Sequence, residues 1–269
     1  MDVEHNIIYL QTDLDLLRKK IEKLRTELSM LVLERDTLLY QECKNIEAVY
    51  MLELGAVEYQ AYQLECRVLR LKRKKELIQA KINRQEKIDL KGIEAILEEE
   101  FIKYEAELKQ KIEQMNVALE WSKNEVLSKE ATAELKKLYR TIVKVLHPDM
   151  HPDLPEEKIE LFHRAVEAYQ HGGLEQLRII AALVEQDEEI ADIEDGLASL
   201  NKEKQRLQNF MTRVQEHMQE IKMQFPYNQK ELLQNPEKLD AHKKRMEKYV
   251  LELKDLVADY KMQIAEMLR

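Results

Sequence analysis

The 269-residue sequence is poor in the residues that interrupt helices. It contains five glycines and five prolines, and all the prolines lie within two short segments, 148–155 and 226–236. Because proline lacks a backbone N–H and clashes with the preceding turn, each cluster predicts a break in helical structure. The remaining sequence is free to form long helices.

Cysteine and long apolar runs are also scarce. The two cysteines, Cys43 and Cys66, provide neither a disulfide framework nor metal-ligand spacing, and they indicate inert thiols in a reducing compartment. No N-terminal signal-peptide pattern occurs, and no stretch of about eighteen apolar residues is present that could cross a bilayer. The sequence therefore predicts a cytoplasmic protein without membrane association.

The charge balance argues against nucleic acid as a partner. The formal net charge is −9 and the pI is near 5.5, so overall electrostatics repel a polyanion. Charged residues make up 35% of the chain, a share that favours long, solvated helices over one compact core. We find no nucleotide-binding glycine loop, nucleophile elbow or paired-carboxylate pattern, and we expect neither enzymatic activity nor a cofactor.

Hydrophobic residues recur at alternating spacings of three and four in several segments, as in coiled coils. These segments are 10–31, 64–82, 93–119, 193–225 and 246–267. They predict an all-α, elongated fold of antiparallel coiled-coil helices, with region 1–125 as long N-terminal helices and 186–269 as a C-terminal antiparallel hairpin. Spacing does not distinguish closure within one chain from closure between two, so a homo-oligomer stays an alternative.

Smaller features refine this pattern. Gly55 is either a turn or a tolerated helix glycine, and Asp89 is a suitable N-cap for the helix that follows it. The basic run 70–75 indicates a solvated helix face rather than a binding site. Lys204 occupies a seam position, where a polar residue often specifies register.

Residues 135–149 are the one segment where residue identity points to a specific function. Leu135, Tyr139, Ile142 and Leu146 share one helical face, and basic residues lie opposite. Pro148 ends this helix, since the residue before a proline is pushed out of the helical region. A second helix is predicted to begin near Pro155.

Two helices joined by His-Pro-Asp, with Phe162, Ala165 and Tyr169 on the second, resemble the central hairpin of a J domain over residues 134–169. In that family the hairpin docks on a 70-kDa heat-shock (DnaK-like) chaperone and promotes ATP hydrolysis. The resemblance implies a J-like domain over 126–185 in a co-chaperone whose coiled segments locate a client or an assembly. It also implies a chaperone-binding site formed by His147, Pro148, Asp149, Lys136, Lys137, Arg140 and Lys144.

Departures from the family pattern favour an alternative, a coiled-coil scaffold or tether whose hairpin does not activate a chaperone. Thr141 stands where a basic residue is common, and Ala165 where a larger aliphatic is expected. The family's tyrosine-rich first helix is not evident in 119–134, although the end of the preceding helix, with Trp121, is a candidate to replace it.

A second His-Pro-Asp occurs at 151–153, without a helix leading directly into it, and we assign the functional copy to the first. In an extended strand, His147, Asp149, His151 and Asp153 would share one side as metal ligands. We consider this metal site a minor alternative and predict no metal.

Overall fold

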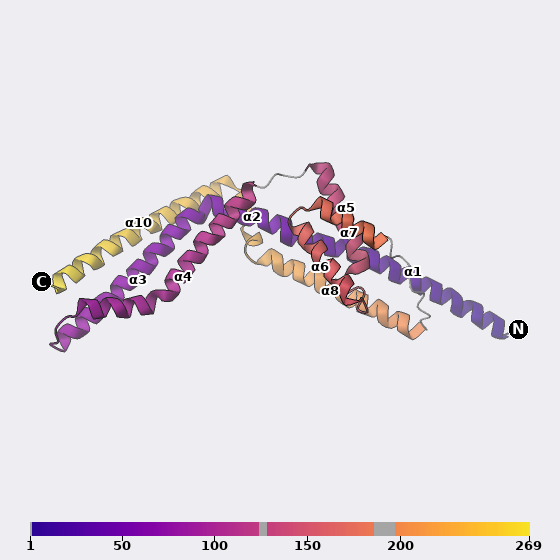
Figure 1. The fold of residues 1–269 in the computed structure, drawn as a ribbon, viewed down its shortest axis with the longest axis horizontal. Helices are drawn as coiled ribbons and strands as arrows, with labels where there is room; N and C mark the ends of the chain where they lie inside the picture. Colours follow the sequence, from indigo (N-terminus) through magenta and orange to yellow (C-terminus); the bar gives the residue numbers. More distant parts are fainter. Residues whose placement is uncertain (1, 124–127, 186–196) are drawn as a thin grey trace. The chain divides into compact units, whose positions relative to one another are not determined.

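The computed structural model describes residues 2–123, 128–185 and 197–269, with side chains described for 14–122, 128–184 and 197–269. These residues contain helices and no strand, so the predicted all-α class is confirmed. The α-helices are α1 (Asp2–Thr37), α2 (Cys43–Tyr50), α3 (Ala56–Asn83), α4 (Leu90–Lys123), α5 (Lys129–Leu146), α6 (Glu156–Gln170), α7 (Leu174–Glu185), α8 (Leu197–Met223), α9 (Lys230–Gln234) and α10 (Pro236–Met267) (Figure 1).

Gly55 is a helix glycine rather than a turn. It ends the second of two π-helical segments, Leu38–Glu42 and Met51–Gly55, that connect α1, α2 and α3 without a break in helical backbone. A Cβ atom at Gly55 would lie 3.4 Å from Met115 Cγ on α4. This is an ordinary van der Waals distance, so Gly55 is a tolerated helix glycine beside α4, and this resolves the choice that the sequence left open.

Several helix boundaries lie at capping residues, one of which, Asp89, was predicted from the sequence. The Asp89 side chain accepts a hydrogen bond of 3.1 Å from the Lys91 N–H, which confirms its predicted N-cap role at α4. Asn235 caps α10 in the same way, directly before Pro236. Gly172 ends α6 with a φ of 70°, a left-handed value that glycine adopts without strain.

The residues group into two compact units. Unit 1 contains residues 1–43 and 125–224, and unit 2 contains residues 44–124 and 225–269. Each unit combines segments that are far apart in the sequence, so the units cut across the consecutive regions 1–125, 126–185 and 186–269. The division into two units therefore depends on which hydrophobic helix faces pack against each other.

In unit 1, α1 packs along α8, and the three helices α5, α6 and α7 pack together beside α1 (Figure 1). Arg25 of α1 pairs with Glu203 near the start of α8, and Asp36 near the end of α1 lies in the field of His217 near the end of α8. This register shows that α1 and α8 run parallel. The predicted seam positions Leu10 and Ile193 lie outside the residues whose side chains are described.

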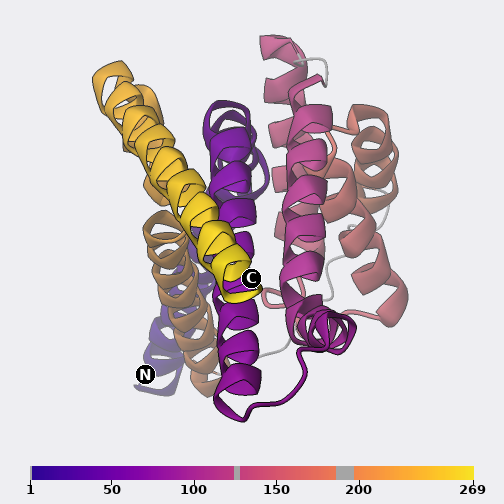
Figure 2. The ribbon, with the colours of Figure 1, turned by 90° about the vertical axis from the view of Figure 1, so that its left-hand side faces the viewer.

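In unit 2, α3 lies between α4 and α10 (Figure 2). Lys75 of α3 donates to Gln263 of α10 and Tyr249 donates to Glu65, so partner numbers rise together and the two helices run parallel. The predicted seam residues of α10 are buried against α3, in clusters that include Val250, Leu253, Val257 and Ile264. In contrast, α4 runs antiparallel to α3.

The predicted C-terminal antiparallel hairpin is wrong. The seam of α8 is buried with α1 in unit 1, and that of α10 is buried with α3 in unit 2, each in a parallel pair within one chain. Heptad spacing specifies which residues need a partner but carries no information on which helix supplies it, because all the seams present similar apolar stripes.

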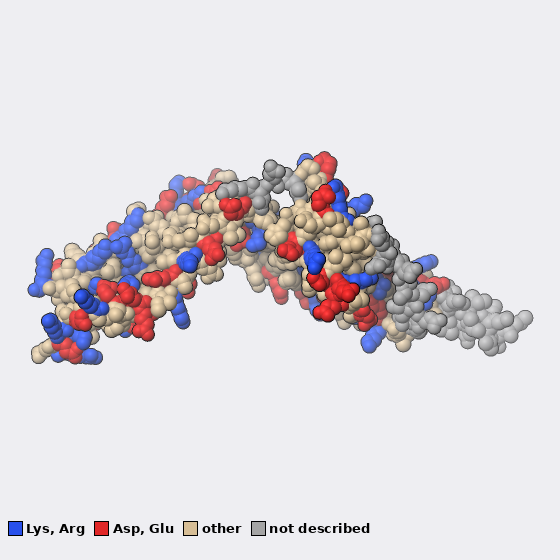
Figure 3. All heavy atoms as spheres, viewed as in Figure 1, with Lys and Arg blue, Asp and Glu red and all other residues tan. Residues whose placement is uncertain are grey.

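The basic run 70–75 faces α4 rather than open solvent alone. Arg70 and Lys74 both pair with Glu94, and Arg73 makes a bidentate pair with Glu100 at 2.8 and 2.9 Å. These pairs are partly exposed and contribute little stability individually. They indicate a structural role in matching α3 to α4, in addition to the solvated face that the sequence predicts. On the face seen in Figure 3, basic and acidic side chains are interspersed in the same manner.

Candidate functional site

The His-Pro-Asp loop between α5 and α6 forms a compact turn. His147 leaves the helical region at the C-cap of α5, as Pro148 predicts, and its carbonyl accepts hydrogen bonds from the Met150 and His151 N–H groups at 2.9 and 3.0 Å. The Asp149 N–H donates to His147 Nδ1 at 3.1 Å. The backbone therefore holds Asp149 in one position relative to α5.

His147 is a core residue, with 6% of its surface exposed. Its ring lies 5.0 Å from the Phe162 ring of α6 and 5.3 Å from the Phe210 ring of α8, measured between centroids. Burial, with the nearby Arg35 cation, lowers the pKa of His147 to about 4, and the neutral ring accepts the Asp149 N–H. The expectation that the loop presents His147 to a partner is thus corrected: Asp149 is exposed and Pro148 is half-buried.

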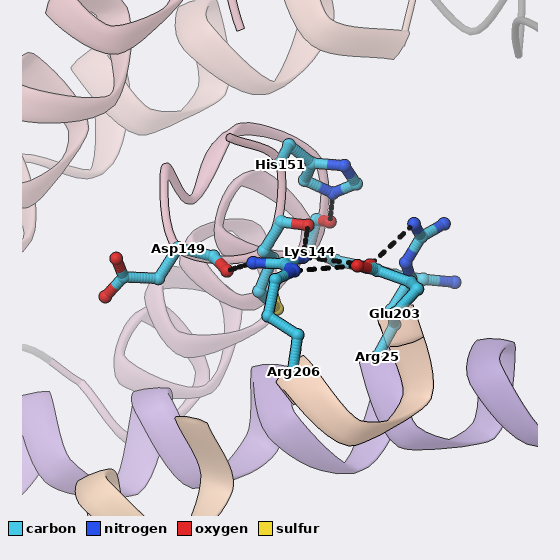
Figure 4. Close-up of polar contacts among 7 residues, drawn as sticks. Arg25, Lys144, Asp149, His151, Glu203 and Arg206 are labelled. Carbon is cyan, nitrogen blue, oxygen red and sulfur yellow. Dashed lines mark hydrogen bonds and ion pairs between the residues drawn. The ribbon is translucent and has the colours of Figure 1, made fainter. Parts of the chain in front are cut away.

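The loop is covered from α8 by Arg206. Its guanidinium donates to the carbonyl oxygens of Asp149 and Met150, the latter at 2.9 Å. Glu203 holds Arg206 through hydrogen bonds of 2.7 and 2.8 Å and also pairs with Arg25 of α1 at 3.3 Å. Figure 4 shows this chain of charged side chains from α1 through α8 to the loop.

The second His-Pro-Asp has a structural role in the same turn. His151 Nε2 lies 2.7 Å from the Lys144 carbonyl oxygen and donates to it, which satisfies one of the last acceptors of α5. The loop is a turn rather than an extended strand, so the geometry required by the metal alternative is absent. Among the residues that the structure describes, no group of three or more His, Cys, Asp or Glu side chains is arranged to hold a metal ion.

The predicted basic face of α5 divides into two parts. Lys137 and Arg140 are exposed and Lys136 is half-buried, and their side chains make no ion pair or hydrogen bond within the described parts of the chain. Lys144 instead pairs with Glu22 of α1 at 2.6 Å. Three of the four predicted cations are therefore available at the surface, and the fourth helps to hold α5 on α1.

A buried polar cluster joins the hairpin to α1. The Tyr139 hydroxyl of α5 donates to Asp36 at 2.7 Å, and the Tyr169 hydroxyl of α6 lies 2.8 Å from Thr37 Oγ1. The two tyrosine rings stack at 4.1 Å between centroids. Burial raises the pKa of Asp36, and the ion pair with Arg35 opposes this effect. Both helices of the hairpin are thus fastened to one short segment of α1.

Trp121, the residue expected in a replacement first helix, lies near the end of α4. It belongs to unit 2, where its indole N–H donates to Asn45 Oδ1 at 2.9 Å. In unit 1, α1, α6 and α7 pack on α5. The replacement of a first J-domain helix by the end of α4 therefore stays a prediction.

Sequence reasoning missed the residues that cover the loop, above all Arg206, Glu203 and Phe210. Two signals were present. Glu203 and Arg206 are spaced as an i, i+3 ion pair beside the seam, and Phe210 widens the apolar stripe next to the seam position Met211. Neither signal indicates contact with a loop more than fifty residues earlier.

Comparison with protein-family models, curated proteins and solved structures finds no match to this chain. Within the described residues, no helix is both long and apolar enough to span a bilayer.

Proposed function

We propose that the chain is a co-chaperone that recruits a 70-kDa heat-shock chaperone and stimulates its ATPase through the α5–α6 hairpin. In this proposal the hairpin is J-like, the His-Pro-Asp loop and the basic face of α5 form the docking surface, and the remaining coiled segments locate a client or an assembly. The protein is not itself an enzyme. Cys43 and Cys66 are buried and form no disulfide, which suits the reducing cytoplasm, where such a chaperone is found.

One observation carries the proposal: an exposed carboxylate, Asp149, lies just after a helix whose exposed cations Lys137 and Arg140 make no ion pair or hydrogen bond within the described residues, although Lys137 lies in the field of Glu134. The turn holds this carboxylate through the Asp149 N–H and the His147 ring. A fixed charge beside a cationic face can recognise a partner of complementary charge with little loss of conformational freedom.

Asp149→Asn is expected to weaken productive docking by at least tenfold, since losing one partner of a charge pair at an interface costs about 2 kcal/mol or more. The measurement is single-turnover ATP hydrolysis by a 70-kDa chaperone across a range of co-chaperone concentrations. Asp153→Asn is the matched control, because Asp153 is also exposed, lies in the second His-Pro-Asp and should be dispensable. His147→Gln tests the positioning of the loop in the same assay.

The co-chaperone proposal would be refuted if neither the intact protein nor its Arg206→Met variant stimulates ATP hydrolysis by the chaperone. Stimulation that responds equally to Asp149→Asn and Asp153→Asn would refute the assignment of the docking loop.

Neutralising Lys137 and Arg140 together is expected to slow association with the chaperone by about tenfold at low salt, because cationic steering acts mainly on the association rate. Stopped-flow measurements at two salt concentrations test this, and the difference between variant and intact protein should shrink at high salt. Arg164→Gln with Lys202→Gln removes the same total charge from elsewhere in unit 1 and serves as the control. An unchanged association rate in the first variant would exclude the basic face from docking.

A scaffold or tether whose hairpin does not engage a chaperone is the second candidate. It is favoured by the burial of His147, by the Lys144–Glu22 ion pair and by the fully buried Ala165, all of which give the hairpin a packing role. Such a protein would fold normally and leave chaperone ATPase unaffected by any loop variant.

A further inference from the structure

Helix α8 makes the contacts that limit access to the His-Pro-Asp loop. Arg206 binds two consecutive carbonyl oxygens, those of Asp149 and Met150, and Phe210 covers one side of the His147 ring. Phe210 is itself 4% exposed. None of these residues belongs to the hairpin that carries the loop, so the covering element is separate in sequence from the surface it covers.

Residues of α8 and α1 hold the covering side chain of Arg206 in place. Glu203 orients the Arg206 guanidinium from one turn earlier on α8, and Arg25 of α1 holds Glu203 from the other side (Figure 4). Phe210 lies one turn after Arg206, so both face the loop from the same stripe of α8. A single displacement of α8 would therefore release both contacts together.

The cover leaves part of the proposed docking surface open. The Asp149 side chain, Lys137 and Arg140 remain exposed, whereas the loop carbonyls and the His147 ring are occupied by α8. A partner could reach the charged groups first, but it could contact the rest of the loop only by displacing Arg206 and Phe210. A partner that used the same backbone acceptors as Arg206 would exclude it, so the two binding events would be mutually exclusive.

We propose that α8 is an intramolecular inhibitory cover of the His-Pro-Asp loop, which competes with the chaperone for this surface and sets the level of stimulation. This inference rests on the proposed co-chaperone function and adds regulation to the same site. A ligand or client that draws α8 away from the loop would activate the protein, since coupling between two binding events is reciprocal.

Arg206→Met tests the proposal. Methionine keeps an unbranched, apolar stem for packing but loses the two hydrogen bonds to the loop. Arg164→Met is the matched control, because Arg164 is an exposed arginine whose ion pair, with Glu160, lies within α6. Hydrogen exchange of the Met150 and His151 amides reports release of the loop, and single-turnover ATPase with a 70-kDa chaperone reports the consequence. Both measurements use the full chain.

In the Arg206→Met protein we expect both amides to exchange faster and the concentration for half-maximal stimulation to fall by about tenfold, the change that corresponds to one charge-assisted hydrogen bond. Faster exchange with unchanged or weaker stimulation would overturn the inhibitory role and leave the co-chaperone function standing. Unchanged exchange would overturn the cover itself. If the two amides exchange faster in the variant but neither the intact protein nor the variant stimulates the chaperone ATPase, the proposed function is refuted.

Discussion

Replacing Tyr139 by alanine is expected to lower the free energy of unfolding of unit 1 by about 3 to 5 kcal/mol, the range typical of deleting a large buried aromatic side chain. Tyr139 has no exposed surface, and its ring stacks on Tyr169. Its removal would also take a hydrogen bond from Asp36, which is 1% exposed. A buried acceptor that loses its donor retains its desolvation cost, so cavity and polar effects act in the same direction.

Two conservative variants separate these effects. Tyr139→Phe keeps the stacked ring and loses only the hydroxyl, and we expect a loss of about 1 to 3 kcal/mol. Tyr249→Phe is the matched control in unit 2, because the exposed Tyr249 hydroxyl also donates to a carboxylate, Glu65, at 2.8 Å. That surface change should be within about 0.5 kcal/mol of zero.

Native-state hydrogen exchange of α5 and α6 measures these effects within unit 1, and urea unfolding followed by circular dichroism provides an independent value. Equal destabilisation by Tyr139→Phe and Tyr249→Phe would contradict the view that burial of the Tyr139–Asp36 pair anchors the hairpin to α1.

Acidification from pH 7 to pH 4 is expected to destabilise unit 1 through His147. The folded-state pKa of His147 is about 4, because burial disfavours the imidazolium, whereas an unfolded histidine titrates near 6.5. Between these values the unfolded state binds more protons, so stability is fully present above about pH 6.5 and is lost as the pH falls towards 4. At about 1.4 kcal/mol per pKa unit, the loss is on the order of 3 kcal/mol.

The comparison that isolates this effect is the pH dependence of unfolding in the intact protein and in His147→Gln, which cannot titrate at this position. His151 has a lowered pKa and contributes with the same sign, whereas Asp36 has a raised pKa and contributes with the opposite sign. Both remain in the variant, so the difference between the two curves belongs to His147. Parallel curves between pH 7 and pH 4 would show that His147 is not buried in its neutral form.

Local elements were predictable because their signals are local. Asp89 caps α4, Pro148 stops α5, and Gly172 ends α6, each through backbone geometry that a few neighbouring residues determine. The hydrophobic spacing likewise identified many of the helix positions that are buried. The hairpin partners of α5 and α6 were predictable because a short loop leaves little choice of neighbour.

The pairing of the helices, and the burial of residues in the His-Pro-Asp loop, were not predictable from local signals. Parallel pairing of α1 with α8 brings together residues almost 180 positions apart, and no spacing rule selects that partner over another apolar seam. The same pairing places Arg206 and Phe210 on the loop, and it turns His147 from an expected docking residue into a buried one.

The amino-acid sequence alone determined that this protein is helical, where several of its helices begin or end, and that a basic helix leads into His-Pro-Asp. These properties depend on backbone conformation and on periodicity within one segment. Only the tertiary structure decided which parts of that motif reach the surface, because exposure depends on what packs against it. Asp149, Lys137 and Arg140 remain accessible, and α8 contacts the Asp149 and Met150 carbonyls and the His147 ring.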